Sequence, residues 1–376
     1  MKKTHVRLAG RSYSILVGRN LFSRLGNLLK PLRLGSKLLI VTNRKVARFF
    51  LKPVRESLRK AGFEVAAPYL LSHGNERDKS SDSLNALWRH MGDVGLERSS
   101  AVLALGGGVV GDVAGFAAST YMRGISVVQV PTTLLAQVDA AIGGKTAIDL
   151  PSAKNMVGTF YQPRLVIADV KTLGPLVKFR NQELPNGFAE VIKYGMIADP
   201  QLFQLLEEKL IGFLNFLSKK SSLSADKFSF LETVVWRSAR IKAKVVSEDE
   251  YEKKGKRLIL NYGHTFAHAF EAVSNYEMPH GEAVALGMVC AARLANARGL
   301  LSSEVERRQN CLIQSAGLPV KAPKRFKVDQ LMRSMMLDKK KKNGELRFIL
   351  PEAIGRVRVV DDVSPGEIKS VLTNLD

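Results

Sequence analysis

Several residue types are scarce in this chain, and each shortage excludes a class of protein. Only two of the 376 residues are cysteine, Cys290 and Cys311, which excludes a disulfide scaffold and a cysteine-based zinc site. Both lie in apolar helical stretches, so we expect two buried free thiols in a reducing, cytoplasmic environment. The longest uncharged apolar run, AVALGMVCAA at 283–292, is about half as long as a membrane-crossing helix. We therefore expect no membrane span, and no secretory signal either, because the N-terminal stretch lacks a continuous apolar segment.

Acidic residues are also scarce: the chain has 35 Asp and Glu against 57 Lys and Arg, which gives a formal net charge of +22. One reading is that this excess only keeps the protein soluble. Basic runs such as KAPKRFK at 321–327 lack regularly interleaved aromatic residues, and no helix-turn-helix, RRM or zinc-finger pattern is present. We therefore expect no nucleic-acid partner. A cleft lined by lysines would instead attract a small polyanionic substrate.

The two halves of the chain carry different secondary-structure patterns. Short aliphatic and β-branched runs predict strands in the first half, at 37–42, 101–105, 125–131 and 164–169. From about Asn186 onward the pattern is helical, as at 187–199 and 280–299. We predict an α/β domain with a mostly parallel sheet at 1–178 and an all-α domain at 179–376. Residues 170–186 would connect them, and 217–227 would form an exposed loop between two helices.

A strand, a glycine-rich turn and the start of a helix follow one another in AVLALGGGVVGDVAGFAA. In this arrangement, backbone N–H groups can approach a phosphate without interference from a Cβ atom. Gly106, Gly108 and Gly111 match G-x-G-x-x-G, but the acidic residue of the standard dinucleotide motif is missing after the next strand. We predict that this turn binds a pyrophosphate without the standard dinucleotide fold. The alternative is a tight turn with a structural role only.

A second polar cluster lies in PTTLLAQVDAAIGGKTAIDLPSAKNMVGTFYQP. It contains two threonines, an aspartate, two lysines and an asparagine: Thr132, Thr133, Asp139, Lys145, Lys154 and Asn155. Thr132 and Thr133 begin a predicted helix that carries Asp139. Each residue alone would be read as a helix cap or a solvated charge. Together, in apolar and glycine-rich surroundings, they indicate a binding site.

Three of the six histidines, His264, His268 and His280, lie within seventeen positions. His264 and His268 are four residues apart and share a helix face, as in two-histidine metal motifs, while His280 begins the next helix. Glu190 lies in an apolar helical stretch, where a buried carboxylate needs a partner such as a divalent cation. H-E-x-x-H is absent, which excludes a zincin-type site. Metal binding, proton transfer and a structural role in the core all remain open at this point.

Read in order, the segments GGGVVGDVAGFAA, PTTLLAQVDAAIGGKTA, KNMVGTFYQP, GFAEVIKYG, LNYGHTFAHAFEA and HGEAVALGM closely resemble the 3-dehydroquinate synthase family. The resemblance implies an N-terminal NAD-binding α/β domain and a C-terminal α-helical domain that binds metal and substrate. This is the dehydroquinate synthase-like fold, related to that of iron-containing alcohol dehydrogenases. It also implies a zinc and substrate site in the cleft between the domains.

The resemblance assigns roles to single residues as well. It makes Glu190, His264 and His280 the ligands of zinc or cobalt, and it leaves His268 to form a hydrogen bond or to handle a proton. It places NAD against Asn43, Glu76, Lys79, Gly107, Gly108, Val109, Val110, Gly111, Asp112, Thr132, Thr133, Lys145, Lys154, Thr172 and Leu173. It places the substrate beside Arg123, Asp139, Lys145, Asn155, Lys193, Lys242, Arg257 and Asn261, with Lys339 or Lys340 as a further candidate.

The implied activity converts 3-deoxy-D-arabino-heptulosonate 7-phosphate (DAHP) to 3-dehydroquinate and phosphate, a step of the shikimate pathway. The reaction passes through transient oxidation by NAD, phosphate elimination, reduction and aldol cyclisation, and the enzyme is expected to be a homodimer. Lysines and arginines suit a substrate that carries both a phosphate and a carboxylate. Three alternatives stay open: another sugar-phosphate cyclase, a metal-dependent polyol dehydrogenase and a basic nucleic-acid-binding scaffold.

Overall fold

The computed structural model describes residues 1–376 except 152, 175–182, 219–223, 342–345 and 376. Its contacts divide the chain into two compact units, each built from two segments. Unit 1 comprises Met1–Phe179 and Leu223–Tyr251, and unit 2 comprises Arg180–Ser222 and Glu252–Asp376. The division expected from the sequence, 1–178 and 179–376, differs in the segment Leu223–Tyr251. That segment forms a helix that packs against strands of unit 1, a contact between residues far apart in the sequence.

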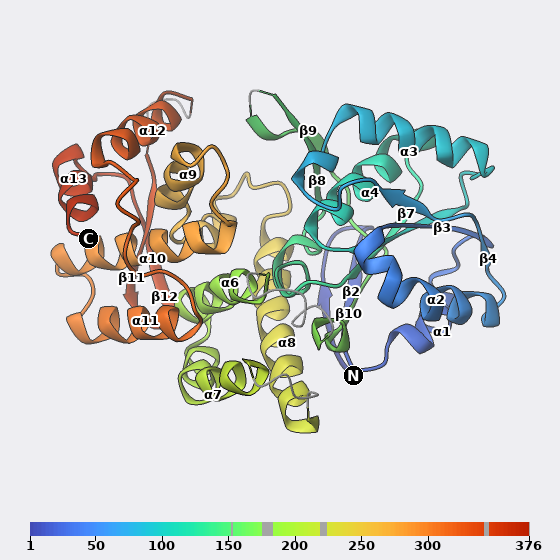
Figure 1. Cartoon of the computed structure of the whole chain (residues 1–376), viewed down its shortest axis with the longest axis horizontal. Helices are drawn as coiled ribbons and strands as arrows, with labels where there is room; N and C mark the ends of the chain where they lie inside the picture. Colours follow the sequence, from blue (N-terminus) through green and yellow to red (C-terminus); the bar gives the residue numbers. More distant parts are fainter. Residues whose placement is uncertain (152, 175–182, 219–223, 342–345, 376) are drawn as a thin grey trace. The chain divides into compact units, whose positions relative to one another are not determined.

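Unit 1 is organised around a mixed sheet of eight strands, coloured from blue to green in Figure 1. Its strands are β1 (Lys2–Val6), β2 (Tyr13–Gly18), β3 (Lys37–Asn43), β4 (Glu64–Val65), β5 (Tyr69–Leu71), β6 (Ala101–Gly106), β7 (Ser126–Pro131) and β10 (Leu165–Asp169). The order is β1-β2-β10-β7-β6-β3-β4, with β5 also paired to β3. Only the β1–β2 pair among these is antiparallel. The four strands predicted from aliphatic runs are confirmed as β3, β6, β7 and β10.

Helices cover both faces of this sheet, because successive side chains of a strand point to opposite sides. Their bounds are α1 (Leu25–Leu29), α2 (Arg44–Lys60), α3 (Ser81–Asp93) and α4 (Gly108–Thr120). On β3, Leu38 and Ile40 join the apolar cluster that includes residues of α1 and α2. Leu39 and Val41 join the opposite cluster, with residues of α3 and α4. All four side chains are fully buried, which explains why this strand reads as a continuous apolar run.

The carboxyl ends of β3, β6 and β7 lie at one edge of the sheet, since these strands are parallel. At these three ends lie Asn43, the glycine turn at 106–108 and the pair Thr132–Thr133. The N–H of Thr132 donates to the carbonyl oxygen of Gly106 at 2.9 Å, which joins two of these ends directly. Ligands of open α/β sheets bind at this edge. The sheet topology therefore gathers the predicted cofactor segments.

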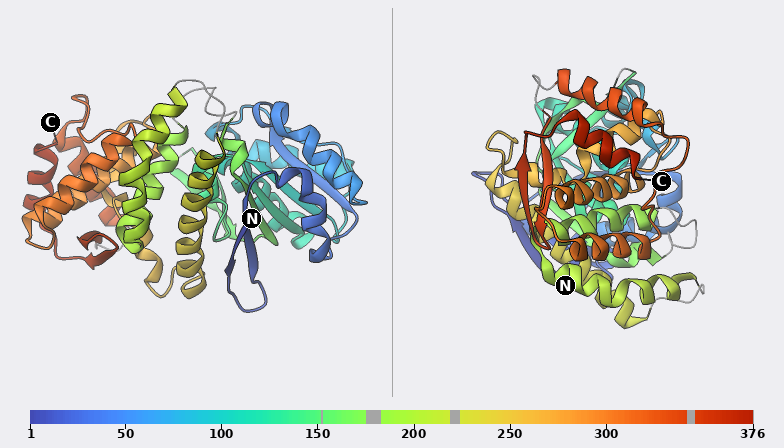
Figure 2. Two further views of the ribbon diagram at one scale, coloured as in Figure 1. Left: turned by 90° about the horizontal axis from the view of Figure 1, so that it is seen from below. Right: turned by 90° about the vertical axis from the view of Figure 1, so that its left-hand side faces the viewer.

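Two further elements complete unit 1. Helix α8 (Ala225–Glu248) packs against β1 and β2, and Figure 2 shows it beside the hairpin that these strands form at the N-terminus. A separate antiparallel hairpin consists of β8 (Lys145–Leu150) and β9 (Ala153–Phe160). It contains the second half of the predicted polar cluster: Lys145 begins one strand of the hairpin, and Lys154 and Asn155 lie in the other.

Unit 2 is mainly helical. Its helices are α6 (Glu183–Ala198), α7 (Pro200–Ser218), α9 (His264–Val273), α10 (His280–Ala297), α11 (Ser303–Ser315), α12 (Val328–Lys341) and α13 (Pro365–Thr373). It also contains an antiparallel hairpin, β11 (Phe348–Ala353) and β12 (Arg356–Val360), which contacts α6 and α10 and is drawn in red in Figure 2. The predicted helical domain is confirmed, but it is not purely α. Within the predicted loop 217–227, α7 ends at Ser218 and α8 begins at Ala225, while residues 219–223 lie outside the described part.

Glycines set the spacing of α9 and α10. A Cβ atom on Gly287 would lie 2.0 Å from the carbonyl oxygen of Gly263, and one on Gly263 would lie 2.8 Å from the backbone nitrogen of Met288. Gly263 also has a φ of +79°, a conformation that side chains other than glycine rarely adopt. The two helices can therefore approach closely only because both positions lack a side chain.

We expect Gly287→Ala to destabilise the protein, by a free energy on the order of 1–3 kcal/mol, because the added methyl group must push backbone apart. Gly212→Ala in α7 is the matched control, since a Cβ there meets nothing within 4 Å. That change should raise stability slightly, because alanine is the better helix former. Thermal denaturation of both variants measures the difference. A Gly287→Ala protein as stable as the control would contradict this account of the packing.

Two expectations from composition have different outcomes. Cys290 is buried as expected, and burial raises the pKa of its thiol, but Cys311 is exposed on α11. The prediction for Cys311 was wrong because apolar neighbours in sequence do not fix which face of a helix a residue occupies. Over the described residues, no helix has the length and apolar character needed to cross a membrane.

Candidate functional site

The glycine turn of unit 1 leads directly from β6 into α4. Gly107 is the N-cap residue and has no side chain that could bond the first N–H groups of the helix. These groups and the positive end of the helix dipole therefore suit an anion. A Cβ on Gly108 would make only an ordinary contact, 3.4 Å from the Cβ of Ala140. Among the described residues, no contact requires glycine at 108, and the missing side chain leaves room at the helix start.

Gly111 has a packing role within unit 1. A Cβ there would lie 2.9 Å from Oε1 of Gln129, whose Nε2 donates to the carbonyl oxygen of Gly111 at 3.1 Å. The residue therefore allows α4 to pack closely on β7, as the third glycine of such motifs does. A contact between Gly111 and the pyrophosphate stays a prediction. Val109 is partly exposed beside Gly108, and Val110 is buried in the core.

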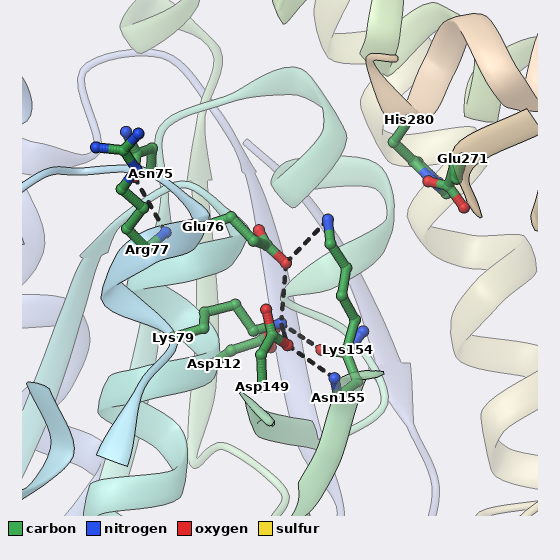
Figure 3. Close-up of polar contacts among 10 residues, drawn as sticks. All are labelled: Asn75, Glu76, Arg77, Lys79, Asp112, Asp149, Lys154, Asn155, Glu271 and His280. Carbon is green, nitrogen blue, oxygen red and sulfur yellow. Dashed lines mark hydrogen bonds and ion pairs between the residues drawn. The ribbon is translucent and has the colours of Figure 1, made fainter. Parts of the chain in front are cut away.

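A buried lysine organises the polar residues at this edge. Lys79 follows the short turn Glu76–Asp78, and its Nζ donates to Oδ2 of Asp112 at 2.8 Å and to Oδ1 of Asn155. Glu76 Oε1 lies 3.8 Å from Lys79 Nζ and 3.5 Å from Lys154 Nζ. Figure 3 shows Glu76, Asp112, Lys154 and Asn155 gathered around Lys79. The structure thus brings together residues from three predicted segments of the cofactor and substrate sets.

Asp149 is a member of this cluster that the sequence analysis did not identify. Its Oδ1 accepts the backbone N–H of Asn155 at 2.7 Å and lies 4.0 Å from Lys79 Nζ, while its own N–H donates to the carbonyl of Lys79 at 2.8 Å. Asn155 has a φ of +56°, which an asparagine tolerates. The backbone of Asp149 therefore holds the β8–β9 hairpin against the loop that carries Lys79, and its carboxylate fixes the turn of that hairpin. The available signal was the aspartate in IDLPSAKN, just before a proline.

Burial shifts the ionisation of this cluster. It raises the pKa of Asp112 to about 6, against the opposing effect of Lys79. For Lys79, burial works against the charge, but Asp112, Glu76 and Asp149 together raise its pKa. The lysine therefore stays charged in the interior, because three carboxylates surround it.

Other predicted cofactor residues have clear roles within the protein. Asn43 caps α2, since its Oδ1 accepts the N–H of Val46 at 2.9 Å. The hydroxyl of Thr133 accepts the N–H of Ala136 at 3.2 Å, and Thr133 is less buried than Thr132. Thr172 is buried, and its hydroxyl contacts the carbonyl oxygens of Asp169 and Thr132 and the amide of Gln137. Neighbouring Leu173 is also buried. Cofactor contacts at Thr172 and Leu173 stay predictions.

Asp139 and Lys242 form a paired site in unit 1. Asp139 lies in a π-helical turn, Ala136–Ala140, a geometry found often at functional sites. Lys242 Nζ, on α8, donates to Asp139 Oδ1 at 2.7 Å and to its carbonyl oxygen at 2.9 Å. The structure therefore unites two predicted substrate residues that lie about a hundred positions apart.

Arg123 and Lys145 are exposed cations on the same unit. Arg123 has a φ of +66° and its neighbour Met122 a φ of +49°, so two successive non-glycine residues adopt a left-handed backbone. Such strain persists where the surrounding structure enforces it, and it gathers at functional sites. Lys145 follows Gly143 and Gly144, whose φ values of +102° and +68° need glycine. Both cations are thus presented by constrained turns.

The three predicted metal ligands meet in unit 2. Nε2 of His264 lies 3.5 Å from Oε1 of Glu190, and Nε2 of His280 lies 3.4 Å from the same oxygen. One donor atom from each of the three residues falls within 4.8 Å of the other two. Donor atoms around a tetrahedral zinc ion, bonded at about 2.0–2.1 Å, lie about 3.3 Å apart. The separations therefore fit a shared divalent cation, and they are long for direct hydrogen bonds.

The second nitrogen of each histidine ring is also engaged. Nδ1 of His264 lies 3.1 Å from the carbonyl oxygen of Tyr262, and Nδ1 of His280 lies 3.0 Å from Oε1 of Glu271. With a metal bound, a proton on Nδ1 would leave Nε2 of each ring its lone pair, the tautomer that a metal ligand requires. His268 is exposed on α9 and does not belong to the cluster. Its ring centroid lies 5.8 Å from that of His264.

The pKa values of the two ligand histidines are shifted in opposite directions. Burial, with Lys193 nearby, lowers the pKa of His264 to about 3, so this ring is neutral and ready to bind a cation. Burial also opposes charge on His280, but Glu190 and Glu271 outweigh it and raise the pKa to about 10. Lys193 is buried next to Glu190 on α6 and pairs with its other oxygen, Oε2. The carboxylate thus faces a cation on one side and two imidazoles on the other.

The remaining predicted residues of unit 2 lie outside the metal cluster. Arg257 is buried in the turn Lys256–Asn261, with Nε 3.2 Å from Glu252 Oε1, and Asn261 is exposed at the end of that turn. Lys339 and Lys340 belong to α12, but their side chains lie outside the described part of the structure. Sequence reasoning missed Glu271. It lies seven residues after His264 and three after His268, so an extended helix-face pattern would have found it.

Solved structures with a similar fold define the class. A 2-epi-5-epi-valiolone synthase from Streptomyces hygroscopicus, with NAD⁺ and Zn²⁺ bound, superimposes with a TM-score of 0.84 at 28% identity, over 96% of each chain. A 2-deoxy-scyllo-inosose synthase with carbaglucose-6-phosphate, NAD⁺ and Co²⁺ gives 0.80 at 26% identity over 99% of each chain. A glycerol dehydrogenase from Schizosaccharomyces pombe shares the fold at 14% identity, with a TM-score of 0.66, over 96% of this chain and 88% of that one. The chain has the dehydroquinate synthase-like fold, which is also that of iron-containing alcohol dehydrogenases.

Sequence comparison narrows the class to a family. Residues 69–182 match the family model for the N-terminal part of 3-dehydroquinate synthase, and residues 187–341 match that for its C-terminal part. A 3-dehydroquinate synthase from Rippkaea orientalis is 46% identical over 98% of this chain and 97% of its own length. The protein belongs to the 3-dehydroquinate synthase family.

Proposed function

We propose that the protein is a lyase that converts DAHP to 3-dehydroquinate and phosphate in the shikimate pathway. The observation that carries this proposal is family membership along nearly the whole chain, combined with a ligand cluster at Glu190, His264 and His280. Several relatives that share 42–46% of its sequence are named 3-dehydroquinate synthase. The activity would also explain the excess of basic residues, because positive charge attracts a polyanionic substrate.

The residues present fit a zinc or cobalt ion and NAD. The metal would be held by Glu190 and Nε2 of both ligand histidines, and the cofactor pyrophosphate by the N-terminus of α4 at Gly107 and Gly108. When bound, the metal polarises a substrate hydroxyl, and NAD⁺ accepts a hydride that it later returns. Lys79 would hold Asp112 and Asn155 in fixed positions beside the cofactor.

Cations of both units suit the anionic groups of the substrate. Arg123 and Lys145 are exposed in unit 1, and Lys193 and Arg257 are buried in unit 2. An exposed arginine offers a planar pair of donors to a phosphate, while a lysine offers a point charge. Lys242 already holds Asp139, so we assign it the role of fixing that carboxylate. His268, exposed one turn after His264, would contact the reacting phosphate or move a proton.

One assay tests this proposal. Purified protein is incubated with DAHP, and released phosphate is measured with and without NAD⁺, and with and without a chelator. We expect phosphate release that needs both NAD⁺ and metal, with no net NADH. Sedoheptulose 7-phosphate and glucose 6-phosphate serve as competitors. Turnover of either in preference to DAHP would identify another sugar-phosphate cyclase, and accumulation of NADH from a polyol would identify a dehydrogenase.

The glycine turn gives a second test. Gly108→Val should weaken NAD⁺ binding by more than tenfold while changing the melting temperature little, since the backbone there is open toward the ligand and not packed. Gly111→Ala should do the opposite and lower thermal stability, because its Cβ meets Gln129. Calorimetric titration with NAD⁺ and thermal denaturation separate the two effects. Unchanged NAD⁺ affinity in folded Gly108→Val would show that the turn is purely structural.

We also propose that the protein works in the cytoplasm as a homodimer without a nucleic-acid or membrane partner. The family resemblance supports this, as does the pair of cysteines without disulfide partners. Light scattering after size-exclusion chromatography would measure the oligomeric state. A monomer at micromolar concentration would contradict the proposal.

A further inference from the structure

Glu271 lies at the metal cluster without being one of its three ligands. It is on the same face of α9 as His264 and His268, near the C-terminal end of that helix. Its side chain is 15% exposed, and Figure 3 shows it directed at the ring of His280. The proposed function gives this carboxylate no role, so its position needs a separate explanation.

The two ligand histidines are held in different ways. The side chain of His264 is 13% exposed, and a backbone carbonyl, that of Tyr262, fixes its Nδ1. His280 is the first residue of α10, and its side chain is 37% exposed. Protein packing therefore restricts this ring less. Oε1 of Glu271, 3.0 Å from Nδ1, is the group that orients it.

Hydrogen bonds to the backbone of Glu271 hold the end of α9 in place. The carbonyl oxygen of Glu271 accepts the hydroxyl of Ser274 at 2.8 Å and the N–H of Tyr276 at 2.7 Å. Asn275 and Tyr276 have φ values of +51° and +60°, so the chain reverses tightly at the end of α9. This turn leads within four residues to His280. The donor and the acceptor of the Nδ1 hydrogen bond are therefore joined by a short, constrained connection.

The negative charge of Glu271 is a second reason to assign it a role at the metal cluster. Lys193 pairs with Glu190, so these two buried groups together carry no net charge. Oε1 of Glu271 lies 3.0 Å from Nδ1 of His280, close enough to form an ion pair with that ring when it is protonated. Glu271 thus adds a negative charge to a poorly hydrated site, where attraction for a divalent cation is strong. A carboxylate behind a ligand histidine also makes the imidazole more basic.

We propose that Glu271 is a positioning residue of the metal centre, which sets the tautomer and orientation of His280 and raises the affinity for the ion. This inference rests on the proposed metal site. It assigns Glu271 no contact with the metal or with the substrate.

The test measures zinc binding by metal-free protein in competition with a chromophoric chelator. Glu271→Ala should weaken zinc binding by about 10–100-fold, the usual effect of losing such a partner. Glu271→Gln keeps an acceptor for Nδ1–H and loses the charge, so its affinity should fall between those of Glu271→Ala and the unchanged protein. Glu277→Gln is the matched control, because Glu277 is an exposed carboxylate in the same connection. It should bind zinc as the unchanged protein does.

A second readout separates positioning from general damage. The visible absorption of bound Co²⁺ reports the geometry of its ligands, and Glu271→Ala should alter that spectrum, whereas Glu277→Gln should not. If Glu271→Ala fails to fold, the near-isosteric Glu271→Gln decides the question alone. Zinc affinity within twofold of the unchanged protein in a folded Glu271 variant, with an unaltered Co²⁺ spectrum, would overturn the inference.

The result also distinguishes this inference from the function on which it rests. Zinc binding by the unchanged protein, and its loss in Glu190→Gln, tests the ligand cluster itself. If neither is observed, the proposed metal site fails. If both are observed and Glu271 variants still bind normally, the assignment of Glu271 alone is wrong.

Discussion

Proteins that carry Glu190→Gln, His264→Ala or His280→Ala should bind zinc far more weakly and turn over DAHP about 10³-fold more slowly. The metal is expected to contribute several kcal/mol of transition-state stabilisation, and each 1.4 kcal/mol corresponds to a tenfold change in rate. Glu190 supplies the oxygen that lies within 3.5 Å of both imidazoles, so the amide variant removes the charge at the centre of the cluster. Zinc stoichiometry by mass spectrometry and phosphate release from DAHP measure the two effects.

Glu190→Gln has a side effect that needs its own control. It leaves Lys193 buried opposite an uncharged group, and a buried charge without its partner destabilises a protein by about 3–5 kcal/mol. The double variant Glu190→Gln/Lys193→Met should recover thermal stability without recovering zinc. Full zinc occupancy in all three single variants would show that the ligand assignment is wrong.

His268→Ala should keep its zinc and lose activity. The ring is exposed on α9 and lies outside the cluster of three donors, so metal binding does not depend on it. Loss of a group that transfers a proton or bonds the reacting phosphate should lower turnover on the order of 10²-fold. His268→Gln separates these roles, because glutamine can donate a hydrogen bond but cannot shuttle a proton. Partial recovery in this variant would indicate hydrogen bonding, and no recovery would indicate proton transfer.

Zinc content and DAHP turnover must come from the same His268→Ala preparation. Loss of zinc would make His268 a ligand and displace His264 or His280 from that role. Full activity would reduce His268 to an exposed helix residue without a function in the reaction. The short spacing of the histidines alone could not decide between these outcomes.

Much of the fold could be predicted because its central strands are buried on both faces. Leu38 to Val41 and Ala101 to Leu105 leave no polar side that would obscure the pattern. The β1–β2 and β11–β12 hairpins were missed, since half-exposed strands such as Lys2–Val6 mix charged and apolar residues. The grouping of α8 with unit 1 could not be predicted either. It depends on contacts with β1 and β2, more than two hundred residues earlier.

The candidate site also contains residues that the sequence reveals and residues whose roles depend on contacts between distant segments. His264, His268 and His280 lie in one segment, and Glu190 stands out as an acid in an apolar helix, so these residues are visible in the sequence. The packing role of Gly111 depends on Gln129, a residue of the neighbouring strand. Asp149 and Glu271 act through hydrogen bonds to other functional residues and belong to no recognisable motif. A sequence pattern identifies the groups that do the chemistry more readily than those that hold them in place.

The segment Leu223–Tyr251 interrupts unit 2, so the chain leaves that unit and returns to it. Neither unit can therefore be excised with a single cut, and a fragment that begins at residue 252 would lack α6 and Glu190. A metal ion at the cluster would join the two separated pieces of unit 2, because Glu190 comes from the first and both histidines from the second. The ion would close the chain between Glu190 and His264 into a long loop. Such a closure restricts the unfolded chain, as a covalent cross-link does. A bound ion would then stabilise the folded form of unit 2 in addition to its role in the reaction. Its removal should lower the stability of unit 2 against unfolding.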